Sequence, residues 1–192
     1  MTNIAVFVSG NGTNCENIIK YFQDDNDINI SLVISNRQDA YALKRAAKYG
    51  VTCKVLSKSE INDEHIILPI LQKFSIDFIV LAGFMLIVPE FIINKYYNKV
   101  INIHPSLLPK FGGKGMYGHH VHEAVKAAGE TETGITIHFV NNICDGGEIF
   151  AQFKINLTQH DSVEDIESKI HLLEQKHFPN VIKDVVNKVM DK

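Results

Sequence analysis

The sequence predicts an α/β fold, a single doubly wound and mostly parallel sheet of about seven strands with helices on both faces. Five apolar runs begin about 20–25 residues apart with helical patterns between them, the spacing of repeated strand–helix units. One run, FIVLA, is apolar throughout, as expected of a strand covered on both faces. The five expected strands are Ile4–Val8, Ile28–Ile34, Thr52–Leu56, Phe78–Ala82 and Val100–Ile103.

Two further expected strands, Gly134–Val140 and Ile149–Ile155, differ from the first five. Both alternate between polar and apolar residues, and a glycine-containing loop separates them. Such alternation is typical of strands with one solvated face. These two strands therefore predict a partly antiparallel addition to the sheet.

The helices between the strands carry recognisable ends. Thr13 and Glu16 have the spacing of a capping box, in which each side chain caps the backbone of the other residue. The helical stretch 41–49 is followed by Gly50, a residue type that commonly ends helices.

The last long helix has two overlapping start signals. Asp161 followed by Glu164 is the first, and Ser162 followed by Asp165 is a weaker one. Pro179 lies inside this stretch and is expected to break or kink the helix two residues earlier, because proline lacks an N–H group and clashes with the preceding turn.

Length and charge limit the classes of function. The 192 residues suffice for one domain, 1–192, with its own core. Hydrophobic residues make up 45% and charged residues 21%, which excludes a disordered chain or a small disulfide scaffold. Nineteen basic and 22 acidic residues give a net charge of −3, so we expect neither nucleic acid nor membrane as partner. We expect small-molecule substrates, and a monomer or homodimer.

The cysteines and the apolar runs indicate a cytoplasmic protein. The three cysteines lack CxxC spacing, and an odd number cannot all pair within the chain, which favours a reducing compartment. The chain opens on a strand-like NIAVFV without a basic leader. The longest apolar stretch, Phe78–Val88, has 11 residues and is too short to cross a bilayer.

The first polar loop, Ser9–Asn14, lies between an expected strand and an expected helix. Its glycines let the backbone approach an anion closely, and the helix N-terminus supplies free N–H donors. Cys15 stands where a dinucleotide loop of the form G-x-G-x-x-G has its third glycine, so a monophosphate fits better than a dinucleotide. A tight turn without any ligand is the alternative.

The second polar loop reads NIHPSLLP and follows the fifth expected strand. Alternation places Asn102 and His104 on the same side of the extended chain. An amide donor beside an imidazole can bind a developing oxyanion and move a proton. The alternative is that His104, which precedes Pro105, is an ordinary loop residue.

The third polar loop, 141–147, contains Asp145 before two glycines. Asp145 either caps a hairpin turn or is a carboxylate that raises the pKa of a nearby imidazole. Cys144 has no base beside it in the sequence, which argues against a thiol nucleophile.

Three histidines, His119, His120 and His122, raise the question of a metal site. Their spacing matches neither HExxH nor HxxEH, and no cysteine joins them. A solvated helix start is the favoured interpretation, so we expect no metal.

Five segments in order carry a resemblance to a known family: SGNGTN at 9–14, LAGFM at 81–85, NIHPSLLPKF at 102–111, TGITIHFV at 133–140 and DGG at 145–147. Over essentially the whole chain they resemble the phosphoribosylglycinamide formyltransferases, the folate-dependent glycinamide ribonucleotide transformylases. The resemblance implies a Rossmann-like sheet. It also implies transfer of a formyl group from 10-formyltetrahydrofolate to the amine of glycinamide ribonucleotide in de novo purine biosynthesis, without a metal.

The resemblance also implies roles for particular residues. Asn102, His104 and Asp145 resemble the catalytic trio. The residues that resemble substrate contacts are Gly12, Thr13, Asn14 and Glu174 for the ribonucleotide, and Met85, Leu86, Ile87, Val88, Asn102, Val140 and Asp145 for the folate.

The chain departs from the family pattern in three places. Leu86 stands where many relatives carry an arginine, and residues 46–101 contain no arginine where many place one before the fourth strand. The segment 112–122 is longer than in many members, which implies variation in a mobile active-site loop.

Three other functions remain as alternatives. Methionyl-tRNA formyltransferases share the SLLP motif but usually add a C-terminal domain for tRNA. Formyltetrahydrofolate hydrolases normally carry an N-terminal regulatory domain. A nucleotide-binding module without catalysis would use the loop 9–14 but would have no use for Asn102, His104 and Asp145 together.

Overall fold

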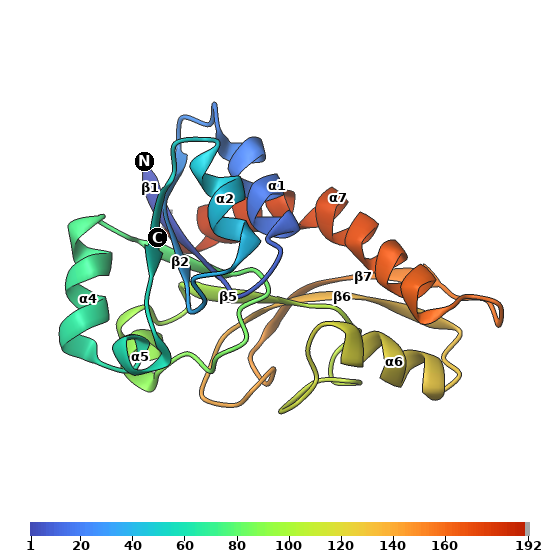
Figure 1. Cartoon of the computed structure of the whole chain (residues 1–192). Helices are drawn as coiled ribbons and strands as arrows, with labels where there is room; N and C mark the ends of the chain where they lie inside the picture. The colour runs from blue at the N-terminus through green and yellow to red at the C-terminus, as the bar shows by residue number, and fades with distance from the viewer. Residues whose placement is uncertain (191–192) are drawn as a thin grey trace.

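A computed structural model describes residues 1–190 and confirms the predicted α/β fold. Seven strands form one sheet in the order β3-β2-β1-β4-β5-β6-β7, and helices cover both faces (Figure 1). The strands are β1 (Thr2–Val8), β2 (Ile28–Ser35), β3 (Thr52–Val55), β4 (Phe78–Leu81), β5 (Val100–His104), β6 (Glu132–Phe139) and β7 (Ile149–Asn156). The helices are α1 (Thr13–Phe22), α2 (Tyr41–Ala47), α3 (Lys58–Ile61), α4 (Glu64–Lys73), α5 (Glu90–Lys95), α6 (His119–Ala127) and α7 (Val163–Met190).

The pairing of the strands sets where a ligand can bind. β1 pairs in parallel with β2 on one side and with β4 on the other, so the chain winds outward from β1 in both directions. In such sheets ligands bind beyond the carboxyl ends of the strands at this reversal. β6 and β7 are antiparallel, as predicted, and the β5–β6 pairing sets Asn102 opposite His138 and His104 opposite Thr136.

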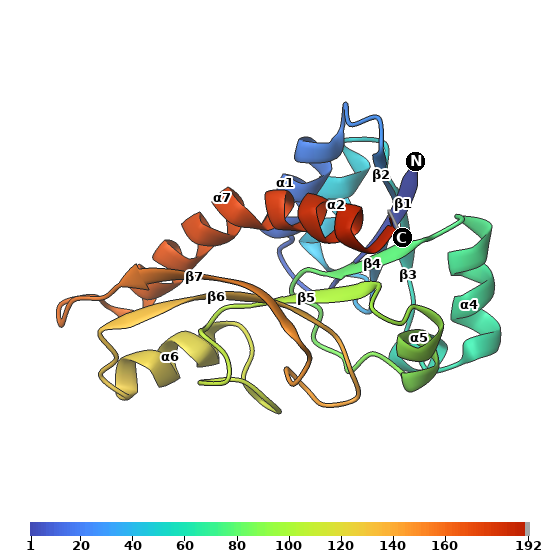
Figure 2. The same cartoon turned by 180° about the vertical axis from the view of Figure 1, so that it is seen from behind.

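Each face of the sheet has its own layer of helices (Figures 1 and 2). In β1, Ile4, Val6 and Val8 face the layer of α1, α2 and α7, whereas Ala5 and Phe7 face α4 and α5. All five side chains are fully buried. Burial on both faces explains why β1 is apolar throughout its inner residues.

Helix α1 does not form the predicted capping box. Gly12 is the residue before the helix and provides no side-chain cap, and Thr13 is already helical. The Glu16 carboxylate instead pairs with the Arg45 guanidinium and accepts from the Tyr49 hydroxyl. The Glu16 carboxylate, which a capping box would need, is therefore bound by Arg45 of helix α2 instead.

Helix α7 begins with the weaker of its two predicted signals. Ser162 Oγ accepts the Asp165 N–H at 3.1 Å, and the Asp165 carboxylate accepts the Ser162 N–H at 2.9 Å, which completes a capping box. Asp161 lies outside the helix, where it accepts the Thr158 N–H and pairs with Lys169.

The predicted interruption at Pro179 does not end helix α7, which runs on to Met190. Phe178, Pro179 and Ile182 are buried in this turn, two of them in the core layer against the sheet. This packing offsets the cost of an internal proline, about 3 kcal/mol. No helix within residues 1–190 has the length and apolar character needed to span a membrane.

Candidate active site

Ser9 joins the loops that follow β1, β2 and β4. Its N–H donates to the Gly83 carbonyl at 3.1 Å, and its Oγ donates to Asn36 Oδ1 at 2.5 Å. The same Oγ accepts the Met85 N–H at 2.8 Å. Ser9 is buried, and buried polar groups are costly unless paired, so this set of bonds fixes the three loops relative to one another.

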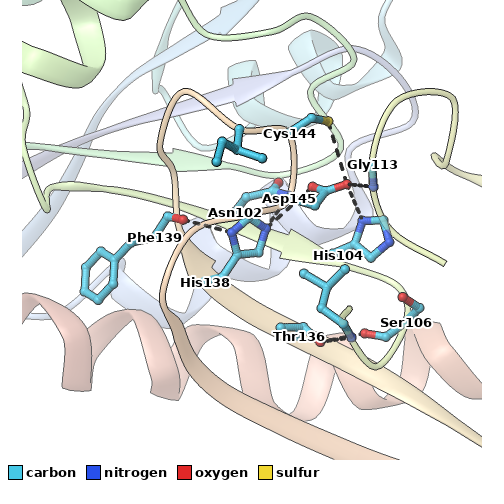
Figure 3. A network of polar contacts seen from close by, with 12 residues as sticks. Asn102, His104, Ser106, Gly113, Thr136, His138, Phe139, Cys144 and Asp145 are labelled. Atoms are coloured by element: carbon cyan, nitrogen blue, oxygen red, sulfur yellow. Dashed lines mark hydrogen bonds and ion pairs between the residues drawn. The ribbon is translucent and has the colours of Figure 1, made fainter. Parts of the chain in front are cut away.

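The structure brings the three predicted catalytic residues together in one network of polar contacts, with Asp145 between His104 and His138 (Figure 3). Asp145 Oδ2 lies 3.6 Å from His104 Nδ1, and Asp145 Oδ1 lies 3.6 Å from His138 Nε2. Asn102 Nδ2 lies 3.2 Å from the same His138 nitrogen. Strand β5 carries Asn102 and His104 on one side, as the alternation predicts, and the loop after β6 carries Asp145.

The other nitrogen of each imidazole is held by the backbone. His104 Nε2 donates to the Phe111 carbonyl at 2.7 Å, and His138 Nδ1 donates to the Phe139 carbonyl at 2.9 Å. Because a carbonyl oxygen only accepts, these nitrogens carry the proton in each neutral ring. The nitrogens left for chemistry are therefore those that face Asp145.

Burial dominates the electrostatics of His104, which is 3% exposed. It lowers the pKa of His104, and the Asp145 charge and the Phe111 carbonyl offset only part of that effect. Asp145 therefore raises the pKa of this imidazole, as one of the two interpretations of the loop predicts, but burial has the larger effect and the pKa of His104 lies below its ordinary value. Burial opposes ionisation of Asp145 as well, but contacts with His138 and His104 and the Gly113 N–H hold its pKa below the usual range.

Asp145 does not cap a hairpin turn, because its carboxylate binds outside the turn, to the Gly113 N–H at 2.9 Å. Its φ of +53° lies in the left-handed region, which costs a non-glycine residue about 1–2 kcal/mol. Gly147 lets the backbone pass close by, since a Cβ there would overlap the Phe139 carbonyl. The loop is shaped to hold one carboxylate between two imidazoles.

The loop after β1 lies beside the start of helix α1. Gly12 has a φ of +76°, and the N–H groups of Thr13 and Asn14 fall in the first turn, where a helix offers no internal acceptor. Asn14 Nδ2 donates to Glu174 Oε2 at 2.9 Å. Burial raises the pKa of Glu174, and the bond from Asn14 offsets only part of the rise. Free N–H donors beside a polar carboxyl suit a sugar phosphate.

Replacing Gly12 by alanine is expected to lower the free energy of unfolding by about 2–4 kcal/mol. The new Cβ would overlap Ala42, on the side of helix α2, and the left-handed φ adds strain. Gly10→Ala is the matched control, because no atom lies within 4 Å of a Cβ there. Thermal unfolding of both variants measures the difference, and equal melting temperatures would contradict the argument.

The residues that resemble a folate pocket divide into two sets. Met85 and Ile87 are 52% and 71% exposed and available to a ligand. Val88 is buried in the core layer under α4 and α5, and the partly buried Leu86 and Val140 pack against that layer, so these three residues offer a ligand less side-chain surface. Leu86, one of the departures from the family pattern, thus has an aliphatic side chain that packs against the core.

The expectation of a solvated helix start holds for two of the three histidines of α6. His119 and His120 are exposed and contact Glu167 and Glu123. His122 is buried instead, and its Nδ1 has no hydrogen-bond partner among residues 1–190. Burial lowers the pKa of His122 to about 4. Val121 and Val125 pack in a small cluster with Ile166 of helix α7. His122 lies next to Val121 in helix α6 and is buried as well.

No group of three or more histidine, cysteine or acidic side chains within the described part of the chain is placed to hold a metal ion. Activity is therefore expected to survive exhaustive chelation, and the purified protein is expected to carry no stoichiometric metal. Elemental analysis and assay before and after chelation measure both. One equivalent of zinc, with activity lost on its removal, would contradict this expectation.

Fold and site together define an α/β protein in which an amide, two imidazoles and a carboxylate lie together where β5 ends and the loop after β6 begins. The chain belongs to the formyl transferase family, whose model matches residues 2–182.

Named relatives agree with this assignment. The chain is 35% identical to "Phosphoribosylglycinamide formyltransferase" of Bacillus subtilis over 97% of this chain and 95% of that protein. It is 38% identical to the protein of the same name from Haemophilus influenzae, over 95% of this chain and 86% of that protein. The crystal structure of phosphoribosylglycinamide formyltransferase from Bacillus halodurans superposes with a TM-score of 0.88 at 30% identity, over 98% of this chain and 97% of the other.

Proposed function

We propose that this chain transfers the formyl group of 10-formyltetrahydrofolate to the amine of glycinamide ribonucleotide, a step of de novo purine biosynthesis. The observation that carries the proposal is the cluster around the Asp145 carboxylate, in which His104 and His138 face its two oxygens and Asn102 contacts the same nitrogen of His138. The relatives' shared name supports the substrate. A binding module without catalysis would not need a buried imidazole paired with a carboxylate.

In the proposed reaction the substrate amine attacks the formyl carbon. The carbonyl oxygen gains negative charge, and Asn102 Nδ2 is the donor placed to stabilise it. A preorganised donor of this kind contributes on the order of 10²–10³ in rate, because it is aimed where charge develops.

His104 moves the proton in this scheme. Its Nε2 is committed to the Phe111 carbonyl, so Nδ1 accepts the proton that the attacking amine releases. The imidazolium so formed lies against Asp145, whose charge stabilises it. The proton then passes to the folate nitrogen as its bond to the formyl carbon breaks, so that the protons balance and the imidazole returns to its neutral form.

Two loops provide the proposed binding sites. The N–H groups of Gly12, Thr13 and Asn14 bind the phosphate, and Glu174 contacts the rest of the ribonucleotide. Exposed Met85 and Ile87, with backbone groups of Leu86, Val88 and Val140, line the folate side of the cleft. Ser9 connects the two loops, which supports their working as one site.

The proposal includes a single domain over 1–192, of which residues 191–192 lie outside the described residues. We further propose that the protein works in the cytoplasm, as a monomer or homodimer, on small molecules and without a metal. The free state of Cys15, Cys53 and Cys144 supports a reducing compartment.

One assay tests the substrate. Purified protein is mixed with 10-formyltetrahydrofolate and either glycinamide ribonucleotide or charged initiator tRNA, and release of tetrahydrofolate is followed together with formylation of the acceptor. Formylation of the ribonucleotide alone is expected. Formylation of the tRNA alone, or folate release without any acceptor, would contradict the proposal.

A further inference from the structure

The Arg45 side chain reaches from helix α2 to the loop before helix α1. Its Nε donates to the Asn11 carbonyl at 2.9 Å, and its Nη2 donates to Asn11 Oδ1 at 3.2 Å. Its Nη1 pairs with Glu16 of helix α1. The guanidinium also lies over the Tyr41 ring, 4.9 Å from its centroid. Each of the three guanidinium nitrogens therefore has a partner in Asn11 or Glu16.

The contact between Arg45 and the Asn11 carbonyl also sets the direction of the Gly12 N–H. The carbonyl of Asn11 and the N–H of Gly12 belong to one planar trans peptide and point to opposite sides of it. Because Arg45 holds the carbonyl toward helix α2, the Gly12 N–H points away from that helix. Within residues 1–190 this N–H has no backbone acceptor, so it is free to bind an anion.

We propose that Arg45 is a positioning residue for the substrate phosphate, which it never touches. It holds the Asn11–Gly12 peptide so that the Gly12 N–H joins those of Thr13 and Asn14 in one anion site. The inference rests on the proposed function, because it takes the loop to be the phosphate site of the ribonucleotide.

The shape of the guanidinium makes this role specific to arginine. Three nitrogens in a rigid fork reach two oxygens of Asn11 and the carboxylate of Glu16 at once. A lysine would keep the charge and the pairing with Glu16 but would offer a single nitrogen. Arg45→Lys therefore separates the positioning role from a simple ion pair between helices α1 and α2.

Glu16→Gln is the complementary change. It removes the ion pair and leaves both contacts with Asn11 in place. If Arg45 only ties the two helices together, Glu16→Gln will lower the stability, Arg45→Lys will change it little, and neither variant will weaken substrate binding. If Arg45 positions the loop, only Arg45→Lys will weaken binding of the ribonucleotide. Arg37→Lys is the matched control, since Arg37 is the other arginine of the chain and pairs with Asp39 on the surface.

The experiment measures kcat and the KM of each substrate for the wild type and the three variants. Arg45→Lys is expected to raise the KM for glycinamide ribonucleotide about tenfold, the scale of a lost charge-assisted hydrogen bond, with kcat and the folate KM changed less than about twofold. Glu16→Gln and Arg37→Lys are expected to leave the ribonucleotide KM within about twofold of wild type. An unchanged KM in Arg45→Lys, or an equal rise in Glu16→Gln, would overturn the inference.

Hydrogen exchange of the backbone amides of residues 16 and 42, which donate to the Gly12 and Gly10 carbonyls of the loop, gives a second readout without substrate. Faster exchange is expected in Arg45→Lys than in Glu16→Gln, whatever the substrate is. If the wild type does not formylate the ribonucleotide, the proposed function fails and this exchange result decides the positioning role alone. Should Arg45→Lys fail to fold, Asn11→Ala removes one of the two loop contacts, and a smaller rise in the ribonucleotide KM is expected, whereas no rise would overturn the inference.

Discussion

Asn102→Ala and His104→Ala are each expected to lower kcat by about 10²–10³, with smaller changes in either KM. Asn102→Ala removes the donor for the developing oxyanion. His104→Ala removes the nitrogen that accepts the proton of the amine. Both residues lie in β5, where Asn102 is paired with β4 and β6 and His104 is paired with β6. The losses should therefore reflect chemistry and not a displaced loop.

Steady-state kinetics with both substrates measure these effects. His65→Ala is the control, because the His65 side chain is 88% exposed and its ring lies beside Glu64 on the surface. Its kcat is expected to match the wild type. A large rise in KM with unchanged kcat in either active-site variant would assign that residue to binding only.

Asp145→Asn is expected to lower kcat by about 10–10³, because a nearby opposite charge shifts a pKa by roughly 1–3 units. The neutral amide no longer stabilises the imidazolium that forms on His104. Burial already lowers the pKa of His104, and Asp145 opposes that shift, so its removal lowers the pKa further.

The pH dependence follows from that direction. In the proposed reaction His104 must be neutral to accept the proton, so activity falls on the acid side, where the ring is already protonated. A lower pKa moves this acid limb to lower pH in Asp145→Asn. The pH–rate profile, together with an NMR titration of His104, measures the shift. An acid limb that stays in place would show that Asp145 does not act on His104.

The sheet was predictable from sequence because its strands are buried on both faces. Runs such as Phe78–Ala82 carry the same apolar signal at every position, so their existence does not depend on knowing their neighbours. The alternation of the last two strands likewise identified their antiparallel pairing. Strand ends shifted by one or two residues, as at β1, which begins at Thr2.

Helix ends were less predictable, because they depend on competition between partners. Glu16 had the correct spacing to cap Thr13, but Arg45 lies 29 residues away in sequence and its position beside Glu16 is a property of the fold. The same holds for Pro179, whose cost is offset by burial that a helical pattern does not reveal.

The candidate site was predictable in part. One local motif predicted that Asn102 and His104 lie on the same side of a strand. The prediction that Asp145 joins them rested on the resemblance to a family. His138 was missed. The signal for it is the β5–β6 register, which sets it opposite Asn102, and a register between strands about 30 residues apart cannot be read from spacing alone.

The charge state of His104 was also beyond sequence reasoning. A carboxylate neighbour predicts a raised pKa, but the loss of water around a ring that is 3% exposed outweighs it. Only the packing of the loops that follow β5 and β6 decides which effect is larger.

The central claim is that Asn102, His104 and Asp145 form one catalytic centre in which Asp145 works through His104. Single-turnover formyl transfer to glycinamide ribonucleotide by the wild type, His104→Ala, Asp145→Asn and the double variant tests it most directly. We expect the double variant to be within about threefold of His104→Ala, because residues that act as a unit are not additive. Rate losses that multiply fully in the double variant would contradict it.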